Sequence, residues 1–273
     1  MENINEFMQS VSRKTIFADF DFENDDLPCG CSKFGGVPDV PDNFVWPVYC
    51  GEGYNGETKE RPLAFMFQIN CEDIAQYDTE NIYPHSGVLS FFYEMYSQCW
   101  GFDPNHKGSS RVYYFEDSSA LSPAAVPDDI EEENRLKSGK AVISLKEDYP
   151  HPNELDFDDD DDYDEYSDAY DEYTDELPEA VNKLGGYPMY VQSAGCEIEC
   201  ELVSRGVYTG DGKLDITDEV REAAKEWTML FQLDSIDDAD LMFGDCGRLF
   251  WFIRKDELAN KNFDNTWVIL QCY

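Results

Sequence analysis

The sequence predicts a mainly β protein with minor helix, internally duplicated, in which two β-rich repeats pack around a pseudo-two-fold axis. Two observations lead to this fold class. Short runs rich in Phe, Tyr, Trp, Val, Ile and Leu alternate with Gly, Pro, Asp or Asn, which is typical of strands joined by turns. Four such blocks recur later in the chain in the same order. The 273 residues suffice for a substantial core.

The recurring blocks define the duplication. The first block reads KFGGVP and returns as KLGGYP, and a strand-like block LAFMFQIN returns as WTMLFQLD. One such match is weak evidence, but four in order indicate a duplicated unit. The paired blocks are 33–38 with 183–188, 63–70 with 227–234, 87–93 with 247–253, and 102–115 with 263–271.

The composition divides the chain into four expected segments. They are an N-terminal helical extension (1–27), a first β repeat (28–150), an acidic, tyrosine-rich insert or linker (151–177) and a second β repeat (178–273), with both repeats forming one compact unit. Residues 1–12 predict a helix, because Ile4, Met8 and Val11 fall on one stripe.

Each repeat begins with Gly-Gly-x-Pro. Gly and Pro are unfavourable inside a helix, so this block predicts a turn, and the glycines allow another backbone to approach closely. In the strand at 87–93 both alternating sets of side chains are largely apolar, which predicts strands covered on both faces, as when two similar sheets pack together. Short helices are expected at 218–227, which opens with acidic residues, and at 256–261.

The charge of the chain excludes several classes of partner. Its 20 Lys and Arg face 59 Asp and Glu, and a net charge of -39 repels nucleic-acid phosphates and anionic lipid head groups. No apolar run approaches the ~18 residues of a membrane-spanning helix, and the first residues lack a secretory signal pattern. Nine scattered cysteines do not resemble a disulfide framework. We therefore expect a cytoplasmic protein that binds neither nucleic acid nor membrane.

The insert carries the densest charge, because residues 154–176 hold fourteen acidic side chains and no basic one. Four tyrosines at helical spacing fall on a single stripe, Tyr163, Tyr166, Tyr170 and Tyr173. One interpretation is a solvated acidic linker that folds against the body through these tyrosines. The other is an aromatic and acidic clamp in which the tyrosines contact a basic protein partner.

Polar residues at matching positions of the two repeats are candidates for a ligand site. Gln68 and Asn70 in the first repeat correspond to Gln232 and Asp234 in the second. A Gln among apolar strand residues is unfavourable unless both ends of its amide are bonded. We expect these side chains to meet near the pseudo-axis, where they would pin the halves together or line a cleft between them.

Two arginines stand out in a chain with few cations. For Arg111 and Arg248 we expect structural ion pairs rather than an anion site, with Asp103 and Asp245 as candidate partners. If a cleft lies between the repeats, both arginines would line it.

Motifs for catalysis and cofactors fail when their structural context is considered. The segment 51–56 matches G-x-G-x-x-G, but Pro62 and a strand-like run follow too soon for the helix that a dinucleotide requires, so we expect a hairpin loop. Residues 158–169 lack the Gly and Glu of an EF-hand loop. His106 is the strongest of three histidines as a general base, although a loop histidine bonded to backbone is the commoner case.

The cysteines offer one further possibility. Cys29, Cys31, Cys196 and Cys200 could supply four thiolates, but their spacing is not that of zinc sites. We therefore predict no catalytic residue, no cofactor and no metal.

Several blocks together also carry a resemblance to a known family. They are KFGGVPDVP at 33–41 followed by WP at 46–47, FQIN at 67–70, GVLSFFY at 87–93, GDCGRLF at 244–250, and NFDNTW at 262–267 with QC at 271–272. From about residue 28 to the end, the chain resembles the YwqG-like family of bacterial proteins, apart from the acidic insert. The resemblance implies a mainly β fold. The family is one of unknown function, so the resemblance implies no catalytic residues, and by association with toxin systems it implies an immunity-like role.

Three hypotheses about function follow. The first is a non-enzymatic cytoplasmic binding protein whose acidic surface engages a basic protein partner, since dense negative charge steers a cationic partner and weakens with salt. The alternative is a small-ligand binder or enzyme with a cleft between the two repeats. The third is a domain whose acidity serves solubility alone.

Overall fold

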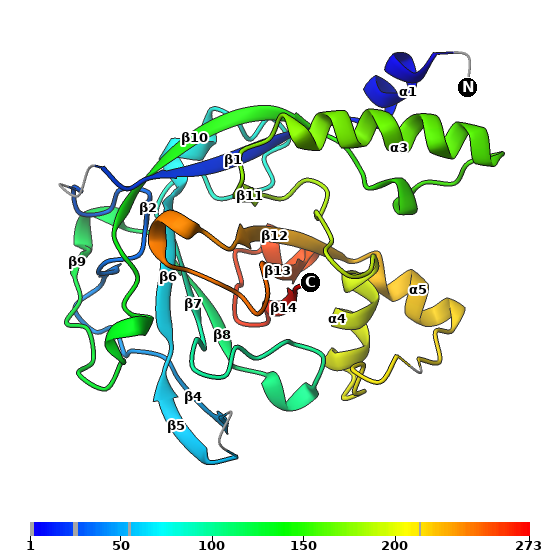
Figure 1. The fold of residues 1–273 in the computed structure, drawn as a ribbon. Helices are drawn as coiled ribbons and strands as arrows, with labels where there is room; N and C mark the ends of the chain where they lie inside the picture. Colours follow the sequence, from blue (N-terminus) through cyan, green and yellow to red (C-terminus); the bar gives the residue numbers. More distant parts are fainter. Residues whose placement is uncertain (1–2, 24–26, 54–55, 213) are drawn as a thin grey trace.

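Ten antiparallel strands form one continuous sheet that is nearly closed on itself (Figure 1). The computed structural model describes residues 3–23, 27–53, 56–212 and 214–273, and it confirms a mainly β chain. In spatial order the strands are β14 (Trp267–Gln271), β13 (Arg248–Arg254), β12 (Trp227–Asp234), β11 (Lys183–Leu184), β1 (Arg13–Asp21), β10 (Gly139–Asp148), β2 (Lys33–Phe34), β6 (Ala64–Asn70), β7 (Val88–Tyr93) and β8 (Ser110–Phe115).

Two small sheets and six helices among the described residues surround this sheet. The small sheets pair β3 (Asp39–Val40) with β9 (Ser122–Pro123) and β4 (Val48–Glu52) with β5 (Thr58–Pro62). The helices are α1 (Ile4–Val11), α2 (Cys71–Ala75), α3 (Asp160–Asp175), α4 (Cys196–Ser204), α5 (Asp218–Ala224) and α6 (Lys255–Ala259).

The long antiparallel pair β1–β10 lies at the centre of the sheet. Its register runs from Arg13 opposite Asp148 to Asp21 opposite Lys140. The group β2-β6-β7-β8 continues the sheet on one side and β11-β12-β13-β14 on the other. Within residues 3–23 of the predicted helical extension (1–27), α1 is the helical part and residues 13–21 supply the central strand β1. The apolar run at 16–18 is too short to stand out in the sequence beside the amphipathic stripe of α1.

Strands that are apolar on both faces do not form two stacked sheets here. Every residue of β7 is buried, as expected for a strand covered on both sides. One face packs into the central core, and the other is covered by residues around the β4–β5 hairpin, including Leu63 and Tyr49. In the second half, Cys196, Cys200 and Val203 of α4 cover the outer face of β12–β14. A hairpin with its flanking loops on one side, and a helix on the other, thus take the place of the expected second sheet.

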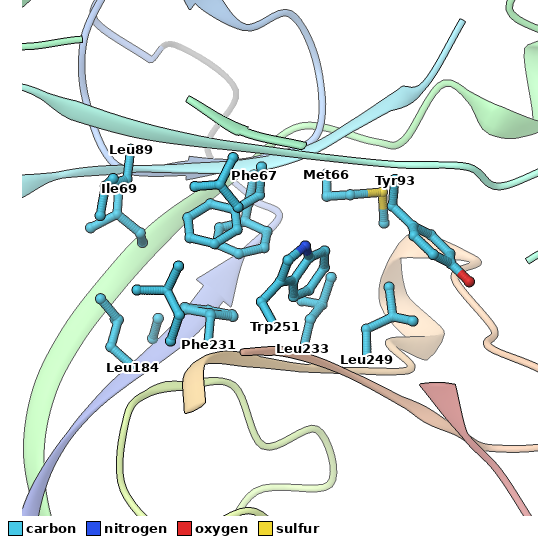
Figure 2. Packing of buried hydrophobic residues seen from close by; sticks show 14 of the residues in the cluster. Met66, Phe67, Ile69, Leu89, Tyr93, Leu184, Phe231, Leu233, Leu249 and Trp251 are labelled. Carbon is cyan, nitrogen blue, oxygen red and sulfur yellow. The ribbon is translucent and has the colours of Figure 1, made fainter. Parts of the chain in front are cut away.

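The interior of the sheet is filled by aromatic and aliphatic side chains from both strand groups. Figure 2 shows Phe67 facing Phe231 and Trp251, and Phe67 and Phe91 stack with ring centroids 4.2 Å apart. The centroids of Phe67 and Phe231 are also 4.2 Å apart, while Trp251 meets Phe67 edge-on at 5.7 Å. Aromatic pairs in these geometries stabilise a core beyond their buried area.

The open edges of the sheet meet through the loop after β7. The Trp100 carbonyl accepts a hydrogen bond from the Leu270 N–H of β14 (3.0 Å), and the Gly101 carbonyl accepts from Trp267 Nε1 (2.7 Å). Gly101 has φ +90°, and a Cβ there would lie 1.9 Å from the Val268 carbonyl oxygen. The loop can follow β14 so closely because this residue has no side chain.

The predicted turns are confirmed at both Gly-Gly sites. Gly35, Gly36, Gly185 and Gly186 all have positive φ, and a Cβ on Gly35 would lie 2.2 Å from the Lys137 carbonyl oxygen. The β4–β5 pair confirms the predicted hairpin, although residues 54–55 at its tip lie outside the described residues.

The two short helices predicted in the second half are also present, as α5 and α6. α5 is shorter than expected because β12 begins at Trp227. α4, whose two cysteines and Val203 pack against the outer face of the sheet, was not predicted from the sequence.

Candidate functional site

Gln68 and Asn70, two of the residues predicted to line a cleft, bond the body of their own half. Gln68 Oε1 accepts from the Asp39 backbone N–H (3.0 Å), while its Nε2 donates to the Cys31 carbonyl (2.9 Å) and to Asp39 Oδ2 (2.8 Å). Asn70 Nδ2 donates to the Gly30 carbonyl at 2.9 Å. Both ends of the fully buried Gln68 amide are engaged, as its apolar surroundings require.

Gln232 makes the corresponding bonds in the second half. Its Oε1 accepts from the Met189 N–H and its Nε2 donates to the Val181 carbonyl, both at 2.9 Å. Beside it, Asp234 Oδ2 accepts from Arg248 Nε (2.8 Å), and Arg248 Nη1 donates to the Met189 carbonyl (2.8 Å). Burial raises the pKa of Asp234 although the Arg248 guanidinium opposes this effect. These groups fasten the 181–189 segment to the sheet.

The two arginines have different environments. Arg248 forms a structural ion pair, with Asp234 rather than with Asp245. Arg111 forms no ion pair with a carboxylate of the described residues, and the Asp103 carboxylate instead accepts from the Asn105 backbone N–H. Arg111 lies on the wall of a cavity that Trp227, Arg254 and Trp267 also line.

The space between the two strand groups is a packed apolar core. The cluster joins Phe67 and Phe91 from one group to Phe231 and Trp251 from the other, and all four are fully buried. The predicted polar residues therefore do not converge on a shared cleft. Of these residues, Arg111 lines a cavity, on the outer side of the sheet.

The insert forms α3, and its tyrosine stripe is used for internal packing. Tyr166 and Tyr170 are buried in a cluster with Met8 of α1, and α1 and α3 lie side by side (Figure 1). Tyr163 and Tyr173 are half-buried. The burial of this stripe supports local folding of the insert against the body. Tyr166 and Tyr170 are enclosed and do not face a partner.

The tyrosine hydroxyls connect α3 to the end of β10 and to the segment that follows it. Tyr166 Oη donates to the Pro150 carbonyl (2.9 Å), and Tyr173 Oη donates to Asp148 Oδ1 (3.2 Å). Burial raises the pKa of both phenols above the ordinary range, so they stay protonated donors at neutral pH. These bonds fix the orientation of α3 on the molecule.

The remaining faces of α3 present carboxylates to solvent. We define the acidic face as the exposed acids of this helix, Asp160, Asp161, Asp164, Glu165, Asp168, Asp171, Glu172 and Asp175. Residues 154–176 contain no Lys or Arg that could pair with them locally. The acidic face is therefore a fixed surface of one sign of charge.

The other candidate groups are placed as structural residues. His106 Nδ1 accepts from the Gly101 N–H (3.0 Å), and burial lowers the pKa of His106, so its ring is a neutral backbone acceptor. Burial raises the pKa of Cys196 and of Cys200 well above that of a free thiol, which disfavours the thiolate. Across residues 3–23, 27–53, 56–212 and 214–273, no group of three or more His, Cys, Asp or Glu is arranged to hold a metal.

The fold and these contacts define a class, a mainly β protein built on one nearly closed antiparallel sheet that carries an acidic helical insert. The chain belongs to the family described as Domain of unknown function (DUF1963), which matches residues 32–272. No curated protein matches the chain. Within the described part of the chain, the helices are all too short or too polar to cross a membrane.

Proposed function

We propose that this protein is a non-enzymatic cytoplasmic binding protein that engages a basic protein partner through the acidic face of α3. The observation that carries the proposal is the combination of eight exposed carboxylates with a helix held in place by buried tyrosines. A rigid surface of one sign of charge steers a partner of opposite charge and fixes its orientation. Neither nucleic acid nor a membrane is a partner in this role, because nucleic-acid phosphates and anionic lipid head groups carry the same sign of charge as this protein.

The acidic face stores unfavourable energy that a cationic partner would relieve. Carboxylates recur at i and i+4 along the helix, for example Asp161 with Glu165 and Asp168 with Glu172. Each like-charged pair of this kind destabilises a helix by about 0.2–0.5 kcal/mol. Asp175 in the last turn is also unfavourable beside the negative end of the helix dipole. Contact with lysines or arginines would convert this repulsion into attraction.

The test compares two variants that change net charge equally. In the first, four residues of the acidic face are neutralised, Asp161→Asn, Glu165→Gln, Asp168→Asn and Glu172→Gln. In the control, four exposed acids before β10 are neutralised, Asp128→Asn, Asp129→Asn, Glu131→Gln and Glu132→Gln. Each protein is used to capture partners from a lysate of the source organism at low and at high salt.

We expect a basic protein that is captured at low salt by the native chain and the control, and that is lost at high salt and with the α3 variant. Salt sensitivity follows from screening of exposed charges. Equal capture by both variants would place the partner elsewhere on the body and contradict the role of the acidic face.

We further propose that the chain is YwqG-like, that its two β-rich parts, 28–150 and 178–273, arose by duplication, and that its role is immunity-like. The matching bonds of Gln68 and Gln232 support the duplication, because each amide ties the backbone of the corresponding loop to the sheet. The dense negative charge is suited to masking a basic, nucleic-acid-directed toxin.

A further inference from the structure

We propose that a cavity of about 450 Å3 beside the closure of the sheet binds a small organic phosphate that carries hydroxyl groups. We call it the cation pocket. It lies where the loop before β8 reaches β14, with α4 and the ends of β12 and β13 on its other sides. Its volume is within the range of about 300–1,000 Å3 that small-molecule sites occupy. Its lining includes Lys107, Arg111, Trp227, Arg254, Glu257 and Trp267.

The cation pocket gathers positive charge in a strongly acidic protein. Lys107, Arg111 and Arg254 line it against two carboxylates, Glu257 and Asp264, whereas the whole chain carries a net charge of -39. By contrast, the lining of the cavity beside β1, as far as the structure describes it, holds no Lys or Arg and four acids, Asp19, Glu179, Asp237 and Asp238. The electrostatics of the cation pocket therefore favour an anion that the rest of the surface would repel.

Both arginines of the cation pocket have N–H donors available for a ligand. Arg111 is half-buried and pairs with no carboxylate that the structure describes. Its neighbour Gly108 has no side chain, which leaves room beside the Arg111 guanidinium. Arg254 pairs with Glu201, whose carboxylate is shared with Arg205 and with Trp227 Nε1. A guanidinium has five N–H donors, so Arg254 is held in position by Glu201 and retains N–H groups for an incoming oxyanion.

Glu257 adds an unsatisfied acceptor to the same wall. Its Oε1 accepts a hydrogen bond from Asn265 Nδ2 at 2.5 Å, while its Oε2 is buried without a partner among the described residues. A buried carboxylate oxygen that lacks a donor is costly. Glu257 lines the cavity, so a rotation of its carboxyl group would bring Oε2 to a ligand hydroxyl, which would supply that donor. Glu257 thus discriminates against a bare anion and favours an anion that also carries hydroxyl groups.

Two tryptophans make the floor of the pocket rigid. Trp267 Nε1 is bonded to the Gly101 carbonyl, and the Arg254 guanidinium lies 5.0 Å over the Trp227 ring. Both rings are more than nine-tenths buried, so they move little and offer apolar edges to the carbon skeleton of a ligand. A site held by such fixed groups loses little entropy on binding.

The experiment measures binding to the full chain by calorimetry and by tryptophan fluorescence with three probes. Ribose 5-phosphate supplies the dianion and the hydroxyl groups, inorganic phosphate supplies the anion alone, and ribose supplies the hydroxyl groups alone. We expect ribose 5-phosphate to bind, inorganic phosphate to bind about tenfold more weakly, and ribose to show no binding, because the charged hydrogen bonds contribute most of the affinity.

Two variants and one control identify the site. Arg111→Gln removes a charge that no ion pair uses, and we expect about tenfold weaker binding of ribose 5-phosphate. Lys140→Gln on the exposed side of β10 makes the same change in net charge and leaves binding unchanged. In Glu257→Gln the side-chain oxygen stays with Asn265, so an N–H2 group takes the position of Oε2. We expect the ratio of the affinity for ribose 5-phosphate to that for inorganic phosphate to be smaller in this variant than in the native chain.

Two results would overturn the proposal. One is an absence of heat and of fluorescence change with ribose 5-phosphate at millimolar concentration in a native chain whose thermal unfolding is cooperative. The other is an equal weakening by Arg111→Gln and Lys140→Gln, which would reduce the effect to general charge attraction. Thermal unfolding of each variant shows whether the fold is retained, so a loss of binding is read only from folded protein.

Discussion

At the scale of single residues, the least expected feature is a fully buried ion pair between Lys183 of β11 and Asp148 of β10, 2.8 Å apart. Asp148 also accepts from Thr15 Oγ1 (3.1 Å), from the Tyr187 N–H (2.8 Å) and from Tyr173 Oη. Burial lowers the pKa of Lys183, and the Asp148 carboxylate opposes this effect. Asp148 of β10 therefore links β11, β1 and α3 at one point.

We predict that Lys183→Met lowers the free energy of unfolding by about 3–5 kcal/mol, because it leaves the Asp148 charge buried without its counterion. Urea unfolding followed by tryptophan fluorescence measures the loss. The control is Lys14→Met, which breaks an ion pair with Glu147 whose lysine is 56 % exposed, and which is expected to cost less than about 1 kcal/mol. Similar losses in both variants would show that the buried pair contributes no more than a surface pair.

At the scale of elements, α3 shows how an unfavourable sequence is held in a helix. Asp is a poor helix former and like charges repel along the surface, yet α3 runs from Asp160 to Asp175. Asp159 caps its first turn by accepting from the Asp162 N–H at 2.9 Å, and the acids of that turn suit the helix dipole. Packing of the tyrosine stripe against α1 supplies the remaining stability.

We predict that Tyr166→Ala releases α3 from the body while the sheet stays folded. The change removes a fully buried ring and the bond to the Pro150 carbonyl, with a local loss of about 3–5 kcal/mol. Limited digestion with a protease that cleaves after Glu should then cut within 154–176, and circular dichroism should show reduced helix. Tyr163→Ala, at a half-buried position, is the control and should stay resistant. Cleavage at the same rate in both variants would contradict the anchoring role of Tyr166.

At the scale of the whole molecule, closure of the sheet depends on the approach of the 100–101 backbone to β14. We predict that Gly101→Ala destabilises the protein by more than Gly206→Ala. Both glycines have strongly positive φ, so both changes carry backbone strain of about 1–2 kcal/mol. Only at Gly101 would the new Cβ meet a backbone oxygen, whereas nothing lies within 4 Å at Gly206. Thermal unfolding compares them, and equal shifts would show that closure does not need this contact.

Local features of this fold could be predicted, and distant pairings could not. Short segments of the sequence predicted the Gly-Gly turns, the strand at 87–93 and the helical stripe of the insert. They could do so because turn formation and side-chain periodicity depend on neighbouring residues. The strand at 13–21 was missed, since its partner at 140–148 is remote in the chain and its own apolar run is short. The ion-pair partner of Arg248 was missed for the same reason.

The sequence by itself determined that the chain is mainly β, that it is strongly acidic and that the insert is amphipathic, because composition and periodicity are properties of the unfolded chain as much as of the folded one. Only the tertiary structure decided where each polar group points. It filled the expected cleft with Phe67, Phe231 and Trp251, and it enclosed Tyr166. Arg111 and Arg254 line one cavity because closure of the ten-stranded sheet brings its two edges together. Local sequence patterns do not predict this contact between strands that are far apart in the chain.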